Sequence, residues 1–287
     1  MKDVKAKILL NEKTGHAYYK MVLDVPYIAR LAEPGQFVEI KCSDSFEPIL
    51  RRPFSIHRLK AQGFPQLRSG QARLKGIEIL YEVIGKGTEI LARKKQGNFI
   101  DVLGPLGNGF SLPRAYAPNR MSKASSSLGS SLEPRAIIIS GGIGSAPLVF
   151  LAEELTKKKI KTIVLIGAKT KKLILCEKDF KKLTSEVYVS TDDGTYGCKG
   201  FVSKLFHNIL KTTESNFETV VYVCGPHGML RCIAQICEER NFECQVSLEE
   251  NMACGIGACL GCVINTKTGN KLVCKDGPVF DASELLW

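Results

Sequence analysis

Four cysteines near the C-terminus have the spacing of an iron–sulfur ligand set. Cys254, Cys259, Cys262 and Cys274 form the pattern C-x4-C-x2-C-x11-C. Each iron of a 2Fe–2S cluster takes two thiolates, and the plant-type arrangement draws three of its four sulfurs from one tight loop with this spacing. The sequence therefore predicts a 2Fe–2S cluster in this segment.

A structural zinc site is the alternative for four cysteines. Zinc sites favour two separated C-x2-C pairs, whereas only one such pair occurs here, at Cys259 and Cys262. The x4 spacing therefore favours iron–sulfur. We expect Gly255, Gly257 and Gly261 to give the loop backbone conformations that a Cβ would forbid, and to let N–H groups approach the cluster sulfurs.

Composition narrows the class of protein around this motif. The chain has 287 residues, of which 44% are hydrophobic and 24% charged, as in ordinary globular proteins. Its remaining cysteines have no regular spacing, and its first residues carry no apolar signal-like stretch, so we expect a cytoplasmic protein without a disulfide framework. No apolar run approaches the length of a membrane span. The net charge of +11 lies in short lysine runs without interleaved aromatic residues, so we expect no nucleic-acid partner.

The N-terminal part, residues 1–111, consists of short β-rich segments separated by turns. Six such segments in a row predict an antiparallel β-barrel. Residues 112–134 are rich in Ser and Pro without periodicity, which is typical of a linker or mobile loop, and residues 61–76 resemble a basic hairpin loop. The expected strands are 4–10, 18–25, 36–41, 54–59, 77–84 and 99–103.

From residue 135 to 243 apolar strands alternate with amphipathic helices. This alternation predicts a doubly wound parallel sheet. Residues 244–287 then form a small module that carries the cysteines, so the chain is expected to be a multidomain protein of β and α/β parts. The expected strands of the sheet are 136–140, 161–167, 186–190 and 219–224, and the expected helices are 146–159, 178–183, 202–210 and 228–240.

Two motifs in the barrel part have side chains suited to bind an anion. One is Arg52-Pro53-Phe54-Ser55; by itself it is weak, since Arg52 could pair with any carboxylate and Phe54 could be core. The other is the glycine loop at 85–88, which includes Gly87 and Thr88 and leads into a helix. Glycines and free helix N–H groups make an anion site, although a plain turn is an equal alternative here.

Two motifs in the α/β part follow strands, where such proteins bind ligands. Residues 141–147, with the sequence GGIGSAP, lie between a strand and a helix, which is the context of a dinucleotide pyrophosphate loop. Cys224-Gly225-Pro226 ends another strand, although it could also be a turn with a buried cysteine. Asp192 and Asp193 are candidates near a ribose, where acidic groups favour NAD over NADP; a solvated turn is an equal alternative.

Together these motifs resemble the ferredoxin–NADP reductase superfamily. The segments LGPLGNGF at 103–110, VSLEENMACGIGAC at 246–259 and VCKDGPVF at 273–280 resemble, more specifically, the electron-transfer subunits of class 1B dihydroorotate dehydrogenases. The resemblance covers nearly the whole chain. It implies an FAD-binding barrel domain, an NAD-binding α/β domain and a 2Fe–2S module.

The resemblance also implies roles for individual residues. Phe54 stands where the superfamily often has Tyr stacked on the flavin, so a hydrogen bond from that position is not expected. No residue of this chain is expected to act as a general acid or base. The residues implied to bind FAD are Arg52, Pro53, Phe54, Ser55, Leu80, Tyr81, Glu82, Gly87 and Thr88. Those implied to bind NAD are Gly141, Gly142, Gly144, Ala146, Pro147, Asp192, Asp193, Cys224, Gly225 and Pro226.

The activity implied by the resemblance is electron transfer in pyrimidine biosynthesis. An FMN-containing catalytic partner would oxidise dihydroorotate to orotate, and electrons would pass through the 2Fe–2S cluster and FAD to NAD. A heterotetramer with two chains of each kind is implied, and we expect the partner to contact exposed apolar residues near Leu260, Val279 and Phe280. The alternatives are an NAD(P)H:ferredoxin or sulfide-linked oxidoreductase subunit, and a non-enzymatic metal-binding regulatory module.

Overall fold

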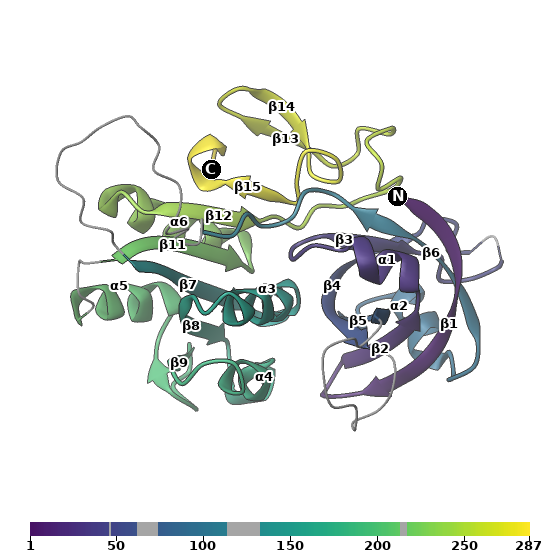
Figure 1. Ribbon diagram of the computed structural model, residues 1–287, viewed down its shortest axis with the longest axis horizontal. Coiled ribbons are helices and arrows are strands. Elements are labelled where there is room, and N and C mark those ends of the chain that lie inside the picture. Colours follow the sequence, from purple (N-terminus) through teal and green to yellow (C-terminus); the bar gives the residue numbers. More distant parts are fainter. Residues whose placement is uncertain (46, 62–73, 114–132, 213–216) are drawn as a thin grey trace.

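The computed structural model describes residues 1–45, 47–61, 74–113, 133–212 and 217–287. These residues form an antiparallel barrel, a mainly parallel sheet covered by helices, and a C-terminal segment that lies along both (Figure 1). Most of the predicted linker at 112–134 and of the insertion at 61–76 falls outside the described residues. Residue 61 and residues 74–76, which were expected in the insertion, belong to strands of the barrel.

Six antiparallel strands close the barrel in the order β1-β2-β5-β4-β3-β6, which confirms the predicted barrel. Alternate residues of a strand point to opposite faces, so Ile8 of β1 and Ile77 and Ile79 of β5 meet in one apolar core. The elements are β1 (Lys2–Lys13), β2 (Tyr18–Asp24), α1 (Pro26–Leu31), β3 (Phe37–Ile40), β4 (Arg52–Ala61), β5 (Leu74–Glu82), α2 (Lys86–Arg93) and β6 (Phe99–Leu106).

The second sheet has the order β10-β9-β8-β7-β11-β12-β15, and only β15 runs antiparallel to its neighbour. The chain builds outward from β7 to β10 and then returns to β11 on the other side of β7. Ligands of such sheets bind at this reversal. The elements are β7 (Glu133–Gly141), η1 (Gly142–Gly144), α3 (Ser145–Lys157), β8 (Lys161–Ala168), η2 (Lys171–Leu173), α4 (Glu177–Lys181), β9 (Val187–Thr191), β10 (Cys198–Lys199), α5 (Val202–Thr212), β11 (Phe217–Cys224), α6 (His227–Arg240) and β12 (Glu243–Ser247).

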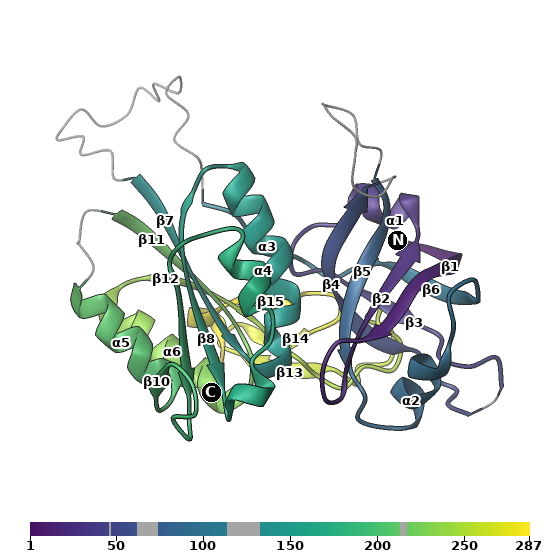
Figure 2. The same ribbon diagram turned by 90° about the horizontal axis from the view of Figure 1, so that it is seen from below.

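Helices cover both faces of this sheet, as a doubly wound fold requires. Successive residues of β7 serve opposite faces: Ile138 packs with residues of α3 and α4, whereas Ile137 and Ile139 pack with residues of α5 and α6. Helix α3 lies between the sheet and the barrel, where it contacts β4 and β5 (Figure 2). This helix therefore fixes the position of the sheet against the barrel.

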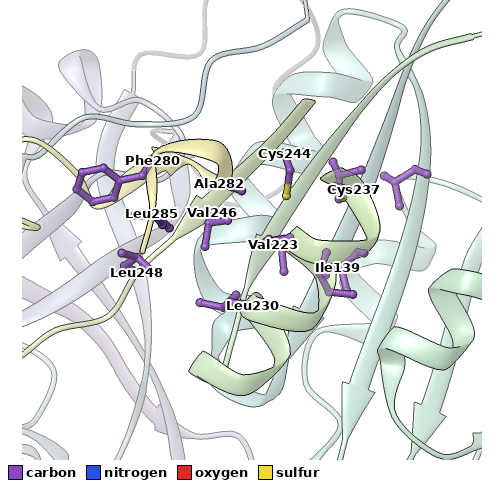
Figure 3. Close-up of a cluster of buried hydrophobic side chains, with 14 of the residues drawn as sticks. Ile139, Val223, Leu230, Cys237, Cys244, Val246, Leu248, Phe280, Ala282 and Leu285 are labelled. Atoms are coloured by element: carbon purple, nitrogen blue, oxygen red, sulfur yellow. The ribbon is translucent and has the colours of Figure 1, made fainter. Parts of the chain in front are cut away.

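The C-terminal segment is integrated into the α/β core. It contains the hairpin of β13 (Val263–Thr266) and β14 (Gly269–Leu272), the edge strand β15 (Val279–Asp281) and the turn η3 (Ala282–Glu284). Strand β15 pairs with β12, and Phe280 lies in the same buried cluster as Leu248 and Leu285 (Figure 3). The boundary expected at 243/244 lies within β12, a strand of the parallel sheet.

One expectation about the surface of this segment is wrong. Phe280 is only 4% exposed, and Val279 is half-buried against the helix-covered core, because β15 completes the sheet. Phe280 is therefore not available to a partner, and Val279 is available only in part. Leu260, by contrast, is 63% exposed, as expected.

Candidate functional site

A cavity of about 530 Å³ lies where the barrel meets the α/β part and the C-terminal segment. Two groups of the residues that line this cavity belong to motifs identified in the sequence. The barrel contributes Arg52, Pro53, Phe54, Ser55, Leu80, Tyr81, Glu82, Gly87 and Thr88, and the start of α3 contributes Ala146.

Arg52 and Gly87 form a cradle at the barrel end of this cavity. The Arg52 guanidinium is held by the carbonyl oxygens of Leu50 and Arg51, at 2.9 and 3.2 Å. A Cβ at position 87 would lie 3.1 Å from Arg52 Nε, so only glycine leaves the guanidinium open at this point. A fixed cation beside open backbone N–H groups suits a phosphate.

Thr88 shapes the N-terminus of α2. Its hydroxyl donates to the carbonyl of Gly85 at 2.9 Å and accepts from the N–H groups of Ile84 and Gly85, at 3.0 and 3.2 Å. These bonds close the turn that opens the helix, and Gly85, Lys86 and Gly87 line the cavity. Because helix N–H groups carry partial positive charge, this end of α2 favours an anion.

Phe54 and Tyr81 form the aromatic part of the wall. Their ring centroids are 5.6 Å apart in an edge-to-face arrangement, and Tyr81 also stacks on Tyr19 at 5.7 Å. The Tyr81 hydroxyl donates to Asn11 Oδ1 at 3.0 Å inside the barrel. Phe54 therefore lines the cavity with Tyr81 packed against it, and stacking of its ring on a flavin stays a prediction of the resemblance.

Sequence reasoning missed one wall of the cavity. It consists of the six consecutive residues that join β12 to the cysteine loop: Ser247, Leu248, Glu249, Glu250, Asn251 and Met252. The available signal was their place directly after the last parallel strand, where ligands bind in such sheets. Phe37, Ile84, Ile143 and Pro278 complete the lining.

The pKa of one carboxyl group in this cavity, that of Glu249, is raised by its surroundings. Glu82 and Glu249 both line the cavity. The surrounding protein and the negative charge of Glu82 raise the pKa of Glu249, although the Glu249 side chain is reachable from the cavity. The lining thus carries a carboxyl group from the barrel, Glu82, and one from the segment after β12, Glu249, besides the Arg52 guanidinium.

The glycine loop after β7 packs directly on the end of β11. A Cβ at Gly144 would lie 2.5 Å from the Cys224 carbonyl, and one at Gly141 would lie 2.7 Å from Met229 Sδ. Gly142 has a φ of +56° and open space around it. Cys224 is buried, and burial raises the pKa of its thiol. The structure thus brings both α/β motifs, including Pro147, Gly225 and Pro226, to the reversal point between β7 and β11.

Asp192 and Asp193 are exposed and follow β9 at the same edge of the sheet. The carboxylate of Asp193 accepts hydrogen bonds from the backbone N–H and the hydroxyl of Thr195, at 2.9 and 2.7 Å. These bonds lower the pKa of Asp193. Asp193 thus stabilises its own turn, which leaves Asp192 as the better candidate for contact with a ligand.

The four cysteines form two pairs in the C-terminal loop. Hydrogen bonding couples the thiol of Cys254 to that of Cys259, and the thiol of Cys262 to that of Cys274. Among the described residues, no three of these sulfurs lie within 4.8 Å of one another. A single zinc ion would draw all four sulfurs to about 3.8 Å of one another, whereas two irons take one pair each. The arrangement fits a 2Fe–2S cluster rather than zinc.

Backbone N–H groups surround these sulfurs. Those of Ile256, Ala258 and Cys259 point at Cys254 Sγ from 3.5, 3.3 and 3.4 Å. Burial by itself would raise the pKa of the Cys254 thiol, but these donors outweigh burial and lower that pKa to about 6. The N–H of Gly257 lies 3.2 Å from Cys274 Sγ. Such donors stabilise negative charge on a cluster and its ligands.

The glycine expectation is confirmed at two of three positions. Gly255 and Gly257 have φ values of +69° and +83°, which only glycine adopts without cost. Gly261 does not have a positive φ, so that part of the expectation is wrong. Its neighbour Leu260 has a positive φ instead, of +58°. The turn between Cys259 and Cys262 therefore has a strained residue that points its side chain outward.

Barrel, doubly wound sheet and shared cavity together define a flavin- and pyridine-nucleotide-dependent oxidoreductase of the ferredoxin reductase class. A family model described as the iron–sulfur cluster binding domain of dihydroorotate dehydrogenase B matches residues 249–286, and an oxidoreductase NAD-binding domain matches residues 138–235. A protein from Desulforamulus reducens named "Dihydroorotate dehydrogenase B (NAD(+)), electron transfer subunit" is 39% identical, over 98% of this chain and 97% of its own. A protein of the same name from Geobacillus kaustophilus is 37% identical, over 99% and 96%. The chain belongs to this family of dihydroorotate dehydrogenase B electron transfer subunits.

Solved structures agree on the fold. One chain of an NADH-dependent reduced ferredoxin–NADP oxidoreductase superposes with a TM-score of 0.77 at 24% identity, covering 98% of this chain and 90% of that chain. A ferredoxin NADP+ reductase from Neisseria gonorrhoeae with bound FAD and NADP has a TM-score of 0.62 at 16% identity, covering 83% and 92%. No helix in the described residues is long and apolar enough to span a bilayer.

Proposed function

We propose that this chain carries electrons from an FMN-containing catalytic subunit that oxidises dihydroorotate, through a 2Fe–2S cluster and FAD, to NAD. The observation that carries the proposal is the shared wall. Residues Ser247 to Met252 line the cavity and lead through Ala253 into Cys254, so a flavin and a cluster held there are joined by a few residues of backbone. When bound, these two groups convert single-electron transfer into hydride transfer.

The residues of the chain bind and orient these groups. Arg52, Gly87 and Thr88 suit the FAD pyrophosphate, and Phe54 suits one face of the ring system. Cys254 with Cys259 would hold one iron, and Cys262 with Cys274 the other. The loop at 141–146, with Cys224 beside it, would receive NAD next to the flavin cavity. Asp192 would oppose the extra phosphate of NADP.

Large apolar side chains are exposed around the cluster loop. Ile256, Leu260 and Val263 are 46%, 63% and 48% exposed. Large apolar side chains gathered beside a redox centre are a liability unless a partner covers them. We propose that the catalytic subunit contacts this surface in a heterotetramer of two chains of each kind. All eleven cysteines are free, which supports a reducing, cytoplasmic location.

Reconstitution tests this function. Dihydroorotate and NAD are added to the purified chain alone, and then to the chain mixed with its candidate partner. We expect orotate only from the mixture, whereas the isolated chain should oxidise NADH with artificial acceptors. Orotate formed by the isolated chain would refute the division of labour. Recovery of FMN alone from the heat-denatured chain would refute the assignment of FAD.

A further inference from the structure

A second group of ligand-type side chains lies apart from the cluster loop, where the barrel meets helix α4. A ring nitrogen of His57, the sulfur of Cys176 and a carboxylate oxygen of Asp179 all lie within 4.8 Å of one another. His57 comes from β4, and the other two come from the start of α4. None of the three lines the flavin cavity or holds the cluster.

His57 is oriented as a metal ligand would be. Its side chain is 0% exposed, and Nδ1 lies 2.7 Å from the carbonyl oxygen of Ala146. Because a carbonyl only accepts, Nδ1 carries the proton and Nε2 keeps a free lone pair. Metal-bound histidines are fixed in this way, with one ring N–H on a backbone carbonyl and the other nitrogen on the metal.

The free nitrogen of His57 faces a second acceptor that lacks a donor. Glu78 Oε1 lies 3.7 Å from His57 Nε2, and both atoms are buried without a hydrogen-bond partner. The other Glu78 oxygen is held by Lys60 at 2.6 Å. Two buried acceptors that face each other are costly unless a proton or a metal ion lies between them.

The surrounding charges hold the carboxylates and leave room for a cation. Lys20 and Arg58 each lie 3.5 Å from Asp179, and Arg58 also pairs with Glu153 at 2.6 Å. Lys20, Arg58 and the Lys60 that holds Glu78 are three cations, and they are matched by the three carboxylates of Glu78, Glu153 and Asp179. A thiolate at Cys176 would then add a negative charge, which a divalent ion would offset.

We propose that a zinc ion is bound by His57, Cys176, Asp179 and Glu78 and cross-links the barrel to the α/β part. Imidazole, thiolate and carboxylate together suit zinc and exclude magnesium and calcium, which take oxygen ligands. Binding at about 2.0–2.3 Å requires the ligand atoms of His57, Cys176 and Asp179 to close by roughly 1 Å. Glu78, which faces His57 Nε2 from 3.7 Å, lies outside that group of three and has to move further to complete the site. Two ligands come from β4 and β5 and two from α4, so the ion would join the parts of the chain that form the flavin cavity.

The test measures metal content in the purified chain with its cluster and FAD in place. The chain is incubated with equimolar zinc and desalted. Inductively coupled plasma mass spectrometry should then find about one zinc per chain in addition to iron. Cys176→Ser should lower the zinc content at least about fivefold and leave iron and FAD unchanged. Cys198→Ser, at an exposed cysteine of β10, is the matched control and should keep its zinc.

X-ray absorption at the zinc edge separates this site from zinc in the cysteine loop. We expect one sulfur and three nitrogen or oxygen neighbours, with Zn–S near 2.3 Å. His57→Asn should abolish the same signal, and added zinc should raise the melting temperature of the parent chain but not of Cys176→Ser. A four-sulfur signal, or zinc unchanged in Cys176→Ser, would overturn the proposal; so would a zinc content below about a tenth per chain.

Discussion

The carboxyl group of Glu39 lies directly beneath Gly255 of the cluster loop. A Cβ at position 255 would lie 2.5 Å from Glu39 Cγ and 2.8 Å from its Oε1. Glu39 is on β3 of the barrel, next to Pro53 of the flavin motif on β4. This contact connects the cysteine loop to the pair of strands, β3 and β4, that lines the cavity.

Gly255→Ala should therefore prevent normal cluster assembly. The new methyl group meets Glu39, and a φ of +69° adds roughly 1–2 kcal/mol of backbone strain. Iron and acid-labile sulfide per chain should fall by at least about half. Gly97→Ala, at a φ of +90° with open space around it, carries strain without a clash and should keep its iron. Equal iron in the two variants would contradict this prediction.

The ionisation of Glu39 should make stability depend on pH. The pKa of the Glu39 carboxyl group is raised to about 7, mainly by burial. The positive charge of Arg51 lowers this pKa, whereas the negative charge of a Cys254 thiolate raises it further. Because the folded pKa exceeds the unfolded value of 4.5, the folded chain holds the proton longer. As the pH rises from about 4.5 to about 7, the free energy of unfolding of the parent chain should fall relative to that of Glu39→Gln, and above pH 7 the difference should stay constant. The total loss is at most roughly 3 kcal/mol.

Melting temperatures at pH 6 and pH 8 measure this effect. Glu39→Gln should gain stability over the parent chain at pH 8 and gain less at pH 6. Asp44→Asn, at an exposed carboxylate, is the control and should show no such difference. If Glu39→Gln raised the melting temperature more at pH 6 than at pH 8, the pKa of Glu39 could not be raised in the folded chain.

Arg52→Ala should lower the affinity for FAD. A charge-assisted hydrogen bond to a phosphate contributes about 1.5–3 kcal/mol, so the Kd should rise roughly 10- to 100-fold. Arg51→Ala is the matched control, because Arg51 pairs with Asp3 at 2.8 Å and does not line the cavity. Titration of the flavin-free chain with FAD measures both. If the two variants lose affinity equally, Arg52 has no special role at the pyrophosphate.

Local motifs were sufficient to predict the barrel, the parallel sheet and the iron–sulfur segment, since each depends on periodicity or spacing along the chain. The four cysteines as individual ligands stay a prediction. The wall from Ser247 to Met252 was not predicted, because its position depends on β12 lying between β11 and β15. His57 and Cys176 are far apart in sequence and meet only when α3 places the sheet against the barrel. Phe280 was misassigned for the same reason: nothing near it in sequence indicates that β15 joins the sheet.

Asp192→Ser should weaken the preference for NADH over NADPH. A carboxylate near a 2′-phosphate costs about 1 kcal/mol even in water, so the ratio of kcat/KM values should fall roughly fivefold. Asp193→Ser should change the ratio less, because that carboxylate is bonded to Thr195 within its turn. Steady-state reduction of an artificial acceptor measures both ratios. An unchanged ratio in Asp192→Ser would remove this residue from the nucleotide site.

Leu260→Asp should separate partner binding from cluster assembly. Leu260 is 63% exposed between two cluster ligands and has a φ of +58°, a conformation that Asp tolerates better than Leu. The substitution therefore relieves strain in the loop while placing a charge on the proposed partner surface. Iron content should stay unchanged, whereas the Kd for the catalytic subunit should rise at least about tenfold.

Phe201→Asp provides the comparison for this surface. Phe201 is 69% exposed and precedes α5, far along the chain from the cluster loop. Its replacement removes a similar apolar area and adds the same charge, so it controls for general effects on solubility. If both variants bind the catalytic subunit as tightly as the parent chain does, the partner contacts another face. Electrons would then have to enter the cluster by a route that does not pass Leu260.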